Sequence, residues 1–272
     1  MALIAVLISL FIERMVPRWQ EVRELGWFGP LGRRLLERAP ARLGTGAWAV
    51  ALILAGPLLV IWGLQWLVED WLFGFAELLL SIAVLFFALR FGGLDESVDG
   101  YVEAREQGDD QAARHHAQQV IRGPMPPDAD GELRAVAEGV LHRSMEQIFS
   151  VIFWFAVLGP FGAALYRLAA EMRDRLAPEN ETLPAPLTKL MGFLDWAPAR
   201  LMTLAFLLTG SFEEGVEAWR RTGEAEAPEN LDAENRALVR RVGCGALRLP
   251  ESLMTEAERE AAEAGPDTDT IR

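Results

Sequence analysis

The sequence predicts an all-α protein: a polytopic membrane helical bundle of about five transmembrane helices, with a cytoplasmic helical hairpin and C-terminal helices. Hydrophobic residues make up 51% of the chain and charged residues 24%, but the two kinds are segregated along it. Runs with no charge or a single charge occupy residues 47–68, 71–89 and 148–166. At a rise of about 1.5 Å per residue, each run can cross a hydrocarbon layer about 30 Å thick. No alternation of polar and apolar residues typical of strands is sustained.

The first predicted span, residues 2–12, is apolar but short, and Pro17 stops it. Because no basic cluster or small-residue cleavage site accompanies it, we interpret it as a retained helix and not as a removed signal peptide. The third span contains one charge, Glu77. A carboxylate inside the membrane indicates a functional group, whereas a span that begins later would leave Glu77 at the interface.

The fifth predicted span, residues 193–212, carries Asp195 and Arg200 close to its start. Charged groups at the bilayer centre cost about 2.5–3.5 kcal/mol each on insertion scales, so they persist where they are interfacial, paired or required for function. One interpretation makes both residues part of a functional site. The other makes Asp195 a helix cap, places Pro198 in the first turn and lets Arg200 extend to the interface.

Arginines are concentrated in residues 13–46, 90–147 and 213–272. Short cytoplasmic loops retain positive charge during insertion, so five crossings with the N-terminus outside put all three regions in the cytoplasm. Residues 171–192 would then face outward, although they contain basic side chains. The alternative is a fourth helix that breaks at Gly159-Pro160 and re-enters.

The predicted organisation alternates between membrane helices and cytoplasmic helical segments. The tail is predicted to contain amphipathic helices over 212–221 and 232–249 and a short charged helix that begins at Thr255. The four parts are residues 1–90 with the first three spans and an arginine-rich loop, 91–147 as a cytoplasmic helical insertion, 148–212 with spans four and five, and 213–272 as a cytoplasmic helical tail.

Within the insertion, the sequence predicts helices over 94–107 and from Asp109 or Asp110 to 121, separated by Gly108. The two helices should fold back as a hairpin. A further helix over 132–147 continues into span four.

Composition and motifs exclude several classes of function. A net charge of −13 argues against nucleic acid as a partner, because phosphate binding needs clustered Lys and Arg. The single cysteine, Cys244, excludes an intrachain disulfide and a multi-cysteine metal site. The phosphate-binding loop, the nucleophile elbow and the His-Glu-x-x-His zinc motif are absent from the sequence.

Glu138, His142 and Glu146 follow one another at i, i+4 and i+8 in the helix predicted over 132–147, which we call the stem helix. They therefore share one face of it. Two carboxylates and an imidazole in this arrangement can bind a divalent cation or transfer a proton. The other interpretation is a polar stem held by salt bridges to Arg134 and Arg143.

Several short motifs follow one another at characteristic spacing along the chain. They are Phe11-Ile12-Glu13-Arg14, Phe153-Trp154, Leu158-Gly159-Pro160, Tyr166-Arg167 and Leu194-Asp195-Trp196-Ala197-Pro198-Ala199-Arg200-Leu201. Together they resemble the AmpE family of inner-membrane proteins, which are encoded beside a cell-wall recycling amidase and linked to β-lactamase induction. The resemblance runs over most of the chain.

The AmpE family is similar to the CbiB/CobD group of cobalamin synthesis, which joins an aminopropanol unit to a corrinoid carboxylate in an ATP-dependent amide-forming step. In that group the Tyr-Arg pair leads into Asn-Thr-Leu-Asp, and paired aspartates precede the Pro-Ala-Arg. Here Arg167 leads into Leu168-Ala169-Ala170-Glu171, and Met191-Gly192 stand in place of the acidic pair. A metal–nucleotide site needs several carboxylates, so these differences argue against the same ligase reaction.

The resemblance implies a multi-pass protein of the bacterial inner membrane with a regulatory or sensory part in peptidoglycan recycling and β-lactamase induction. The expected partners are the lipid bilayer and either an anionic, muropeptide-like ligand or a cell-wall recycling protein. Arginine would bind the ligand's carboxylates through two parallel hydrogen bonds. The candidate ligand-binding residues, beneath the membrane, are Glu138, His142, Arg143, Arg167, Asp195 and Arg200.

Two other functions stay open. One is an altered amide-forming ligase in which Glu138 and Glu146 hold a divalent cation, the only cofactor that the sequence suggests. The other is a transporter. Glu77 would be a carboxylate buried in the membrane and Gly159-Pro160 would interrupt a helix, and both features are typical of transport paths.

Overall fold

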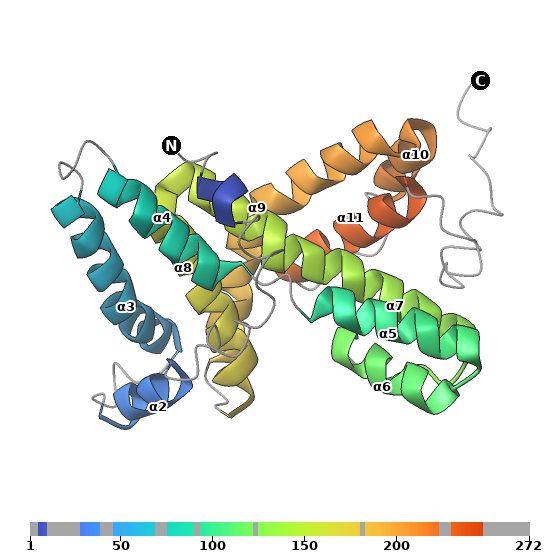
Figure 1. Cartoon of the computed structure of the whole chain (residues 1–272), viewed down its shortest axis with the longest axis horizontal. Helices are drawn as coiled ribbons and strands as arrows, with labels where there is room; N and C mark the ends of the chain where they lie inside the picture. The colour runs from blue at the N-terminus through green and yellow to red at the C-terminus, as the bar shows by residue number, and fades with distance from the viewer. Residues whose placement is uncertain are drawn as a thin grey trace, which may run out of the picture. The chain divides into compact units, whose positions relative to one another are not determined.

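The computed structural model describes residues 5–9, 28–38, 46–68, 75–89, 93–121, 125–179, 183–222 and 230–246. Helices make up nearly all of these residues and none of them lies in a strand, so the predicted all-α class is confirmed (Figure 1). The chain divides into two compact units. Unit 1 contains Met1–Gly93, Arg143–Met202 and Glu226–Val239, and unit 2 contains Leu94–His142, Thr203–Ala225 and Arg240–Arg272.

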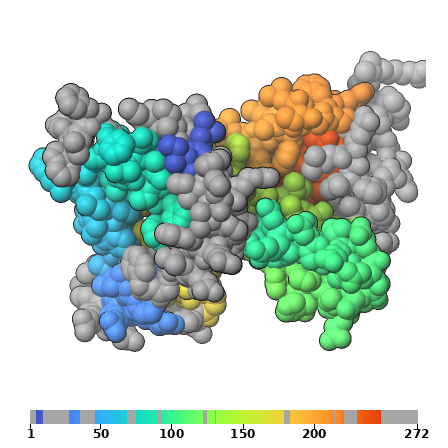
Figure 2. All heavy atoms as spheres, in the orientation of Figure 1, coloured from blue at the N-terminus to red at the C-terminus, as the bar shows by residue number. Residues whose placement is uncertain are grey.

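In unit 1, helices α3 (Gly46–Val68) and α4 (Phe75–Ala88) pack against α8 (Ser150–Arg175), and α2 (Phe28–Arg38) packs against α3 and α8. Apolar residues occupy every face of α3, but only some of them reach the core of the unit. The others lie at the surface, and Trp66, for example, is 73% exposed. Figure 2 shows atoms of α3 at the surface of unit 1. Such an apolar surface suits contact with lipid and indicates a membrane location.

Three helical segments in the described parts of the chain are long and apolar enough to cross a membrane: Gly46–Val68, Gly131–Arg175 and Pro184–Thr209. Helix α4 is apolar but shorter. Glu77 is exposed in the first turn of α4, which agrees with an interfacial carboxylate. The first predicted span is described only over residues 5–9, which are helical, so the number of crossings stays a prediction.

The segment that ends at Arg175 is not a straight rod, because its backbone has non-helical angles at Gly159. The side chains of Glu146 and Arg173 form an ion pair, although 27 residues of straight helix would separate them by about 40 Å. The predicted alternative, a break of the fourth helix at Gly159-Pro160, is therefore confirmed. Helix α8 is a helical hairpin, with arms over residues 150–158 and 160–175.

Local chemistry explains the turn. Gly159 has φ of +65° and ψ of −153°, a conformation open almost only to glycine. Pro160 follows, and proline suits the first turn of a helix because an N–H there has no intrahelical partner. At Gly162 the arms approach so closely that an added Cβ would lie 2.2 Å from the carbonyl oxygen of Trp154. The sequence thus has glycine at the two positions of the turn where a side chain would be strained or would clash, and proline at the position where the second arm begins.

Unit 2 contains the predicted hairpin, formed by α5 (Leu94–Gln107) and α6 (Asp110–Val120). Gly108 separates the two helices with φ of +74°, and the carboxylate of Asp109 accepts hydrogen bonds from two backbone N–H groups in the first turn of α6. The predicted break and cap are both confirmed. Val136 packs with apolar residues of both helices in a small core.

The predicted stem helix and tail helices are also present. The helix predicted to begin at Thr255 lies outside the described residues. The remaining elements are α7 (Ala129–Ser144), the π-helical η4 (Met145–Phe149), the 3-10 helix η5 (Ala177–Glu179), α9 (Pro184–Thr209), α10 (Phe212–Thr222) and α11 (Leu231–Ala246).

The reversal predicts a graded response to alanine substitution. We expect Gly159→Ala to lower the free energy of unfolding by about 1–3 kcal/mol, because alanine is strained in this conformation. Gly162→Ala should lower it at least as much, because the new methyl group meets backbone atoms. Reversible unfolding of the purified protein in mixed micelles measures both changes.

The matched control is Gly63→Ala in α3, where nothing lies within 4 Å of the added Cβ. This change should raise the stability by about 0.5–1 kcal/mol, because glycine weakens a helix interior. If Gly159→Ala were as stable as Gly63→Ala, the reversal would be wrong.

Candidate functional site

Polar side chains gather where the two arms of α8 meet α9. Asp195 of α9 is buried, and its Oδ1 accepts hydrogen bonds from the hydroxyls of Tyr166 at 2.6 Å and Ser150 at 3.2 Å. These donors come from different arms of α8. The indole N–H of Trp154 also donates to the backbone carbonyl of Leu194 at 2.9 Å. Asp195 therefore ties both arms of the hairpin to α9.

A second contact joins η4, which leads into the first arm, to the second arm of α8. Arg173 donates from its two terminal nitrogens to the two oxygens of Glu146, at 2.5 and 3.0 Å, and its Nε donates to Asp174 at 3.0 Å. The side chain of Glu146 is buried and that of Arg173 is largely so. Such bidentate pairing is the strongest arrangement of guanidinium and carboxylate, and it fixes the planes of both groups.

Three charges alternate along the second arm of α8. Glu171 is buried between Arg167 and Arg175, which donate to different oxygens of its carboxylate. The spacing of i, i+4 and i+8 places these residues on one face of the helix. Arg167 is buried as well, whereas Arg175 is partly exposed.

We group these residues under the name ionic centre. It contains three carboxylates and three guanidinium groups, and Asp174, which also accepts from Arg173, lies exposed at its edge. Moving a charge out of water costs several kcal/mol, and pairing offsets much of that cost. Removing one partner from such a pair costs about 3–5 kcal/mol, because an uncompensated charge remains. The ionic centre consists of Glu146, Ser150, Tyr166, Arg167, Glu171, Arg173, Arg175 and Asp195.

A further polar contact within unit 1 holds α9 against α11. Arg200 donates to Glu234 at 2.8 Å and to Asn235 at 3.1 Å, and its guanidinium lies 4.4 Å from the ring centroid of Trp196. Asn235 in turn donates to the backbone carbonyl of Gly192 at 2.8 Å. Arg200 is thus bound by protein groups of the tail.

The predicted ligand-binding residues have different surroundings. Arg167 and Asp195 belong to the ionic centre, and Arg200 belongs to the contact between α9 and α11. A ligand shared by all six predicted residues stays a prediction. By unit, Arg143, Arg167, Asp195 and Arg200 lie in unit 1, and Glu138 and His142 lie in unit 2.

Both predicted metal ligands have guanidinium partners. Glu138 accepts from Arg134 at 2.9 Å and from Arg240 at 3.4 Å, and Glu146 is held by Arg173. A cation would have to displace these groups, so the arrangement does not fit a metal–nucleotide site. Among the residues that the structure describes, no three His, Cys, Asp or Glu side chains are grouped so that they could hold a metal ion.

Sequence reasoning missed several members of the ionic centre. The alternation of Arg167, Glu171 and Arg175 at helical spacing was visible in the sequence and could have identified the charged face. The pairing of Arg173 was not visible, because its partner lies 27 residues away and is reached only through the reversal.

The sequence matches the family model described as "Regulatory signalling modulator protein AmpE" over residues 1–225. The chain belongs to the AmpE family. This membership confirms the predicted resemblance to AmpE, and two relatives named for CobD confirm the distant similarity to that group.

Two curated relatives carry the name "Cobalamin biosynthesis protein CobD". The protein from Chromobacterium violaceum is 32% identical over 258 residues, which cover 88% of this chain and 78% of the relative. The protein from Stutzerimonas stutzeri is 27% identical over 259 residues, which cover 90% and 80% respectively. No solved structure matches the chain significantly.

The pair of Glu146 and Arg173 predicts a measurable coupling energy. We expect Glu146→Gln and Arg173→Gln each to lower the free energy of unfolding by about 3–5 kcal/mol. The double variant should lose less than the sum, because the second change removes the charge that the first left unpaired. A double-mutant cycle in micelles measures this difference.

The exposed pair of Arg105 and Asp110, at 3.2 Å, is the matched control, with side chains 38% and 83% exposed. Its coupling energy should stay below about 1 kcal/mol. Strictly additive losses at the buried pair would contradict the role that we give it.

Proposed function

We propose that this protein is a regulatory protein of the bacterial inner membrane that acts in peptidoglycan recycling and β-lactamase induction. In this proposal, a small anionic ligand or a partner protein acts on it through the ionic centre. The match to a family described as a regulatory signalling modulator carries the proposal. The geometry supports it, because guanidinium and hydroxyl groups hold the carboxylates of the ionic centre. Exchange of one of these partners would change the arrangement of the helices.

The proposed response is an exchange of partners at Arg173. A carboxylate of the ligand would take the bidentate position that Glu146 occupies. Because an unpaired buried Glu146 is costly, the exchange would favour a second arrangement of the α8 hairpin in which Glu146 has another partner or reaches water. The ligand would shift the populations by the difference in its affinity for the two arrangements.

The proposed topology rests on the length of the hairpin. From Glu146 in η4 to Gly159 at the turn, the helical chain rises about 20 Å, less than the roughly 30 Å of the hydrocarbon layer. A hairpin of this depth enters the membrane without crossing it, and both ends of the hairpin emerge on the same face. Helix α9 would lie at that face as well, because the charged helix α11 packs along it at Arg200. The N-terminus would then be outside, and everything after α4 would be cytoplasmic.

Labelling tests this topology. With the native thiol removed by Cys244→Ser, a cysteine placed at Asp174, which is exposed, should react with a membrane-impermeant maleimide in inverted vesicles. It should not react in intact spheroplasts. The opposite pattern would show that the fourth span crosses fully and would separate the end of α8 from the cytoplasm. A cysteine at Glu103 in the exposed part of α5 is the cytoplasmic control.

The second candidate is a role in cobalamin biosynthesis, which the names of the two curated relatives favour. An ATP-dependent ligase would need carboxylates free for a cation, whereas the predicted ligands Glu138 and Glu146 are paired with arginines.

Deletion of the gene in its own host tests both candidates. In a strain with a β-lactam-inducible β-lactamase reporter, we expect the induced β-lactamase activity to fall several-fold on deletion and to return with the wild-type chain. Arg173→Gln should not restore it, because the exchange needs this guanidinium. Lys189→Gln, a change at an exposed position of α9, should restore it at equal membrane abundance.

Induction that is unchanged on deletion would contradict the regulatory role. A requirement of the deletion strain for added cobalamin would favour the second candidate.

A further inference from the structure

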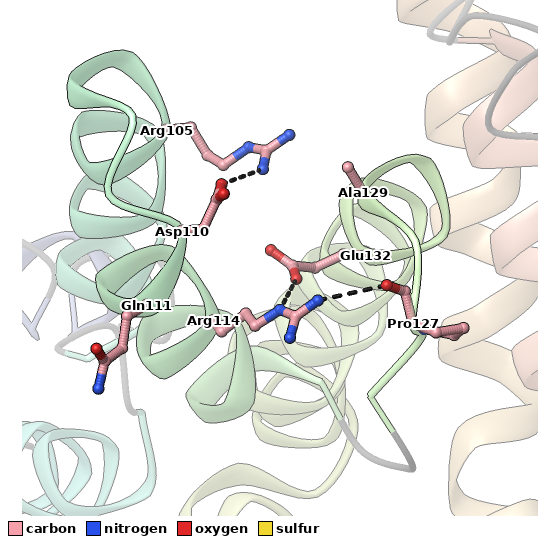
Figure 3. Close-up of a pocket in the computed structure, with 7 residues that line it drawn as sticks. All are labelled: Arg105, Asp110, Gln111, Arg114, Pro127, Ala129 and Glu132. Carbon is pink, nitrogen blue, oxygen red and sulfur yellow. Dashed lines mark hydrogen bonds and ion pairs between the residues drawn. The ribbon is translucent and has the colours of Figure 1, made fainter.

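A polar pocket of about 550 Å³ lies in unit 2 between the end of α5, the first turns of α6 and the start of α7 (Figure 3). It is distinct from the ionic centre, which belongs to unit 1. Two arginines and two carboxylates line it, so its charged groups balance. They are Arg105, Arg114, Asp110 and Glu132.

Local sequence brings three helix ends to this pocket. Gly108 turns the chain between α5 and α6, and Asp109 caps α6. Asp128 caps α7 in the same way, because its carboxylate accepts a hydrogen bond from the N–H of Gly131 at 2.8 Å. The pocket therefore faces the first turns of two helices, where the backbone dipoles favour negative charge.

The two arginines of the pocket are loosely held. Arg105 reaches the highly exposed Asp110 at 3.2 Å. Arg114 is 54% exposed, approaches Glu132 at 3.4 Å and donates to the carbonyl of Pro127 at 3.3 Å. These distances lie at or beyond the long end of the hydrogen-bond range, and exposed pairs of this kind contribute little. Both guanidinium groups can therefore turn to an incoming anion at small cost.

The carboxylate of Glu132 has the opposite character. Its side chain is 3% exposed, and Oε1 lacks a well-aligned hydrogen bond, although the phenol of Tyr101 lies close enough to interact with the carboxylate. In Figure 3 the carboxylate of Glu132 points from α7 toward Arg114, and both residues line the pocket. A buried carboxylate oxygen that lacks a well-aligned donor is costly.

Tyr101 does not neutralise this charge. Burial, and then the negative charge of Glu132, raise the pKa of Tyr101, so its phenol stays protonated. Its hydroxyl is buried and approaches Glu132 without a well-aligned hydrogen bond. The floor of the pocket therefore has a negative charge to offer to a cationic donor, while its rim has two guanidinium groups.

We propose that this pocket binds a small zwitterionic ligand of the amino-acid or short-peptide type. The ammonium of the ligand would lie at Glu132 and its carboxylate between Arg105 and Arg114. The volume lies within the range of about 300–1,000 Å³ that is usual for small-molecule sites. This site would act independently of the ionic centre, so it does not rest on the regulatory function proposed above.

Ligand-observed NMR on the full chain in nanodiscs tests the proposal with a panel of free dipeptides that carry acidic, basic and apolar side chains. We expect at least one dipeptide to bind at millimolar concentration or below. N-acetylation, which removes its ammonium, and C-terminal amidation, which removes its carboxylate, should each weaken binding at least tenfold. Arg105→Gln and Arg114→Gln should do the same, and because both side chains are exposed, the variants should fold.

Arg220→Gln on α10, an exposed arginine outside the pocket lining, is the matched control and should bind as the wild type does. Absence of binding by every dipeptide would overturn the proposal. So would equal binding of the N-acetylated form or of inorganic phosphate, because either result would indicate a simple anion site. Unchanged binding in Arg114→Gln would show that the ligand lies elsewhere.

Discussion

The reversal of α8 at Gly159 is the constraint on which the polar interior of unit 1 depends. In a straight helix Glu146 would lie about 40 Å from Arg173, and Ser150 and Tyr166 could not reach one carboxylate together. The turn places both arms at the same height, so donors and acceptors far apart in sequence meet across the hairpin. A residue with a Cβ would be strained at this position, which makes a single glycine responsible for the whole arrangement.

Pairing then decides which arrangement of the arms is stable. A buried ion pair contributes little compared with an apolar core of the same volume, but an unpaired buried charge costs several kcal/mol. A shift of one arm by one turn would separate Glu146 from Arg173 and Tyr166 from Asp195 at once. The apolar contacts of α3, α4 and α8 supply most of the burial, whereas the ionic centre selects the register. In the proposed function, the same property would let a charged ligand act on the hairpin, because exchanging one partner would disturb the register.

Local features of the fold could be predicted and long-range contacts could not. The helices of the unit 2 hairpin, the break at Gly108 and the cap at Asp109 depend on a few neighbouring residues, and the sequence predicted them. Gly159-Pro160 allowed a break, but hydropathy alone could not distinguish it from a full crossing. The partners of Arg173 and Arg200 lie 27 and 34 residues away, and helical periodicity carries no information at such distances. The charged pocket near Glu132 was missed for the same reason, because it combines three helix ends.

The contact between α9 and α11 gives a physical reason why this chain lacks the acidic pair of the CbiB/CobD group. The equivalent position, Gly192, lies against the backbone of α11, where an added Cβ would be 2.8 Å from the nitrogen of Asp232. The carbonyl of Gly192 also accepts a hydrogen bond from Asn235, and its neighbour Met191 is fully buried. A carboxylate at either position would displace α11 or place an unpaired charge in the core. These positions serve helix packing here, so any activity in cobalamin synthesis would have to draw its carboxylates from another part of the chain.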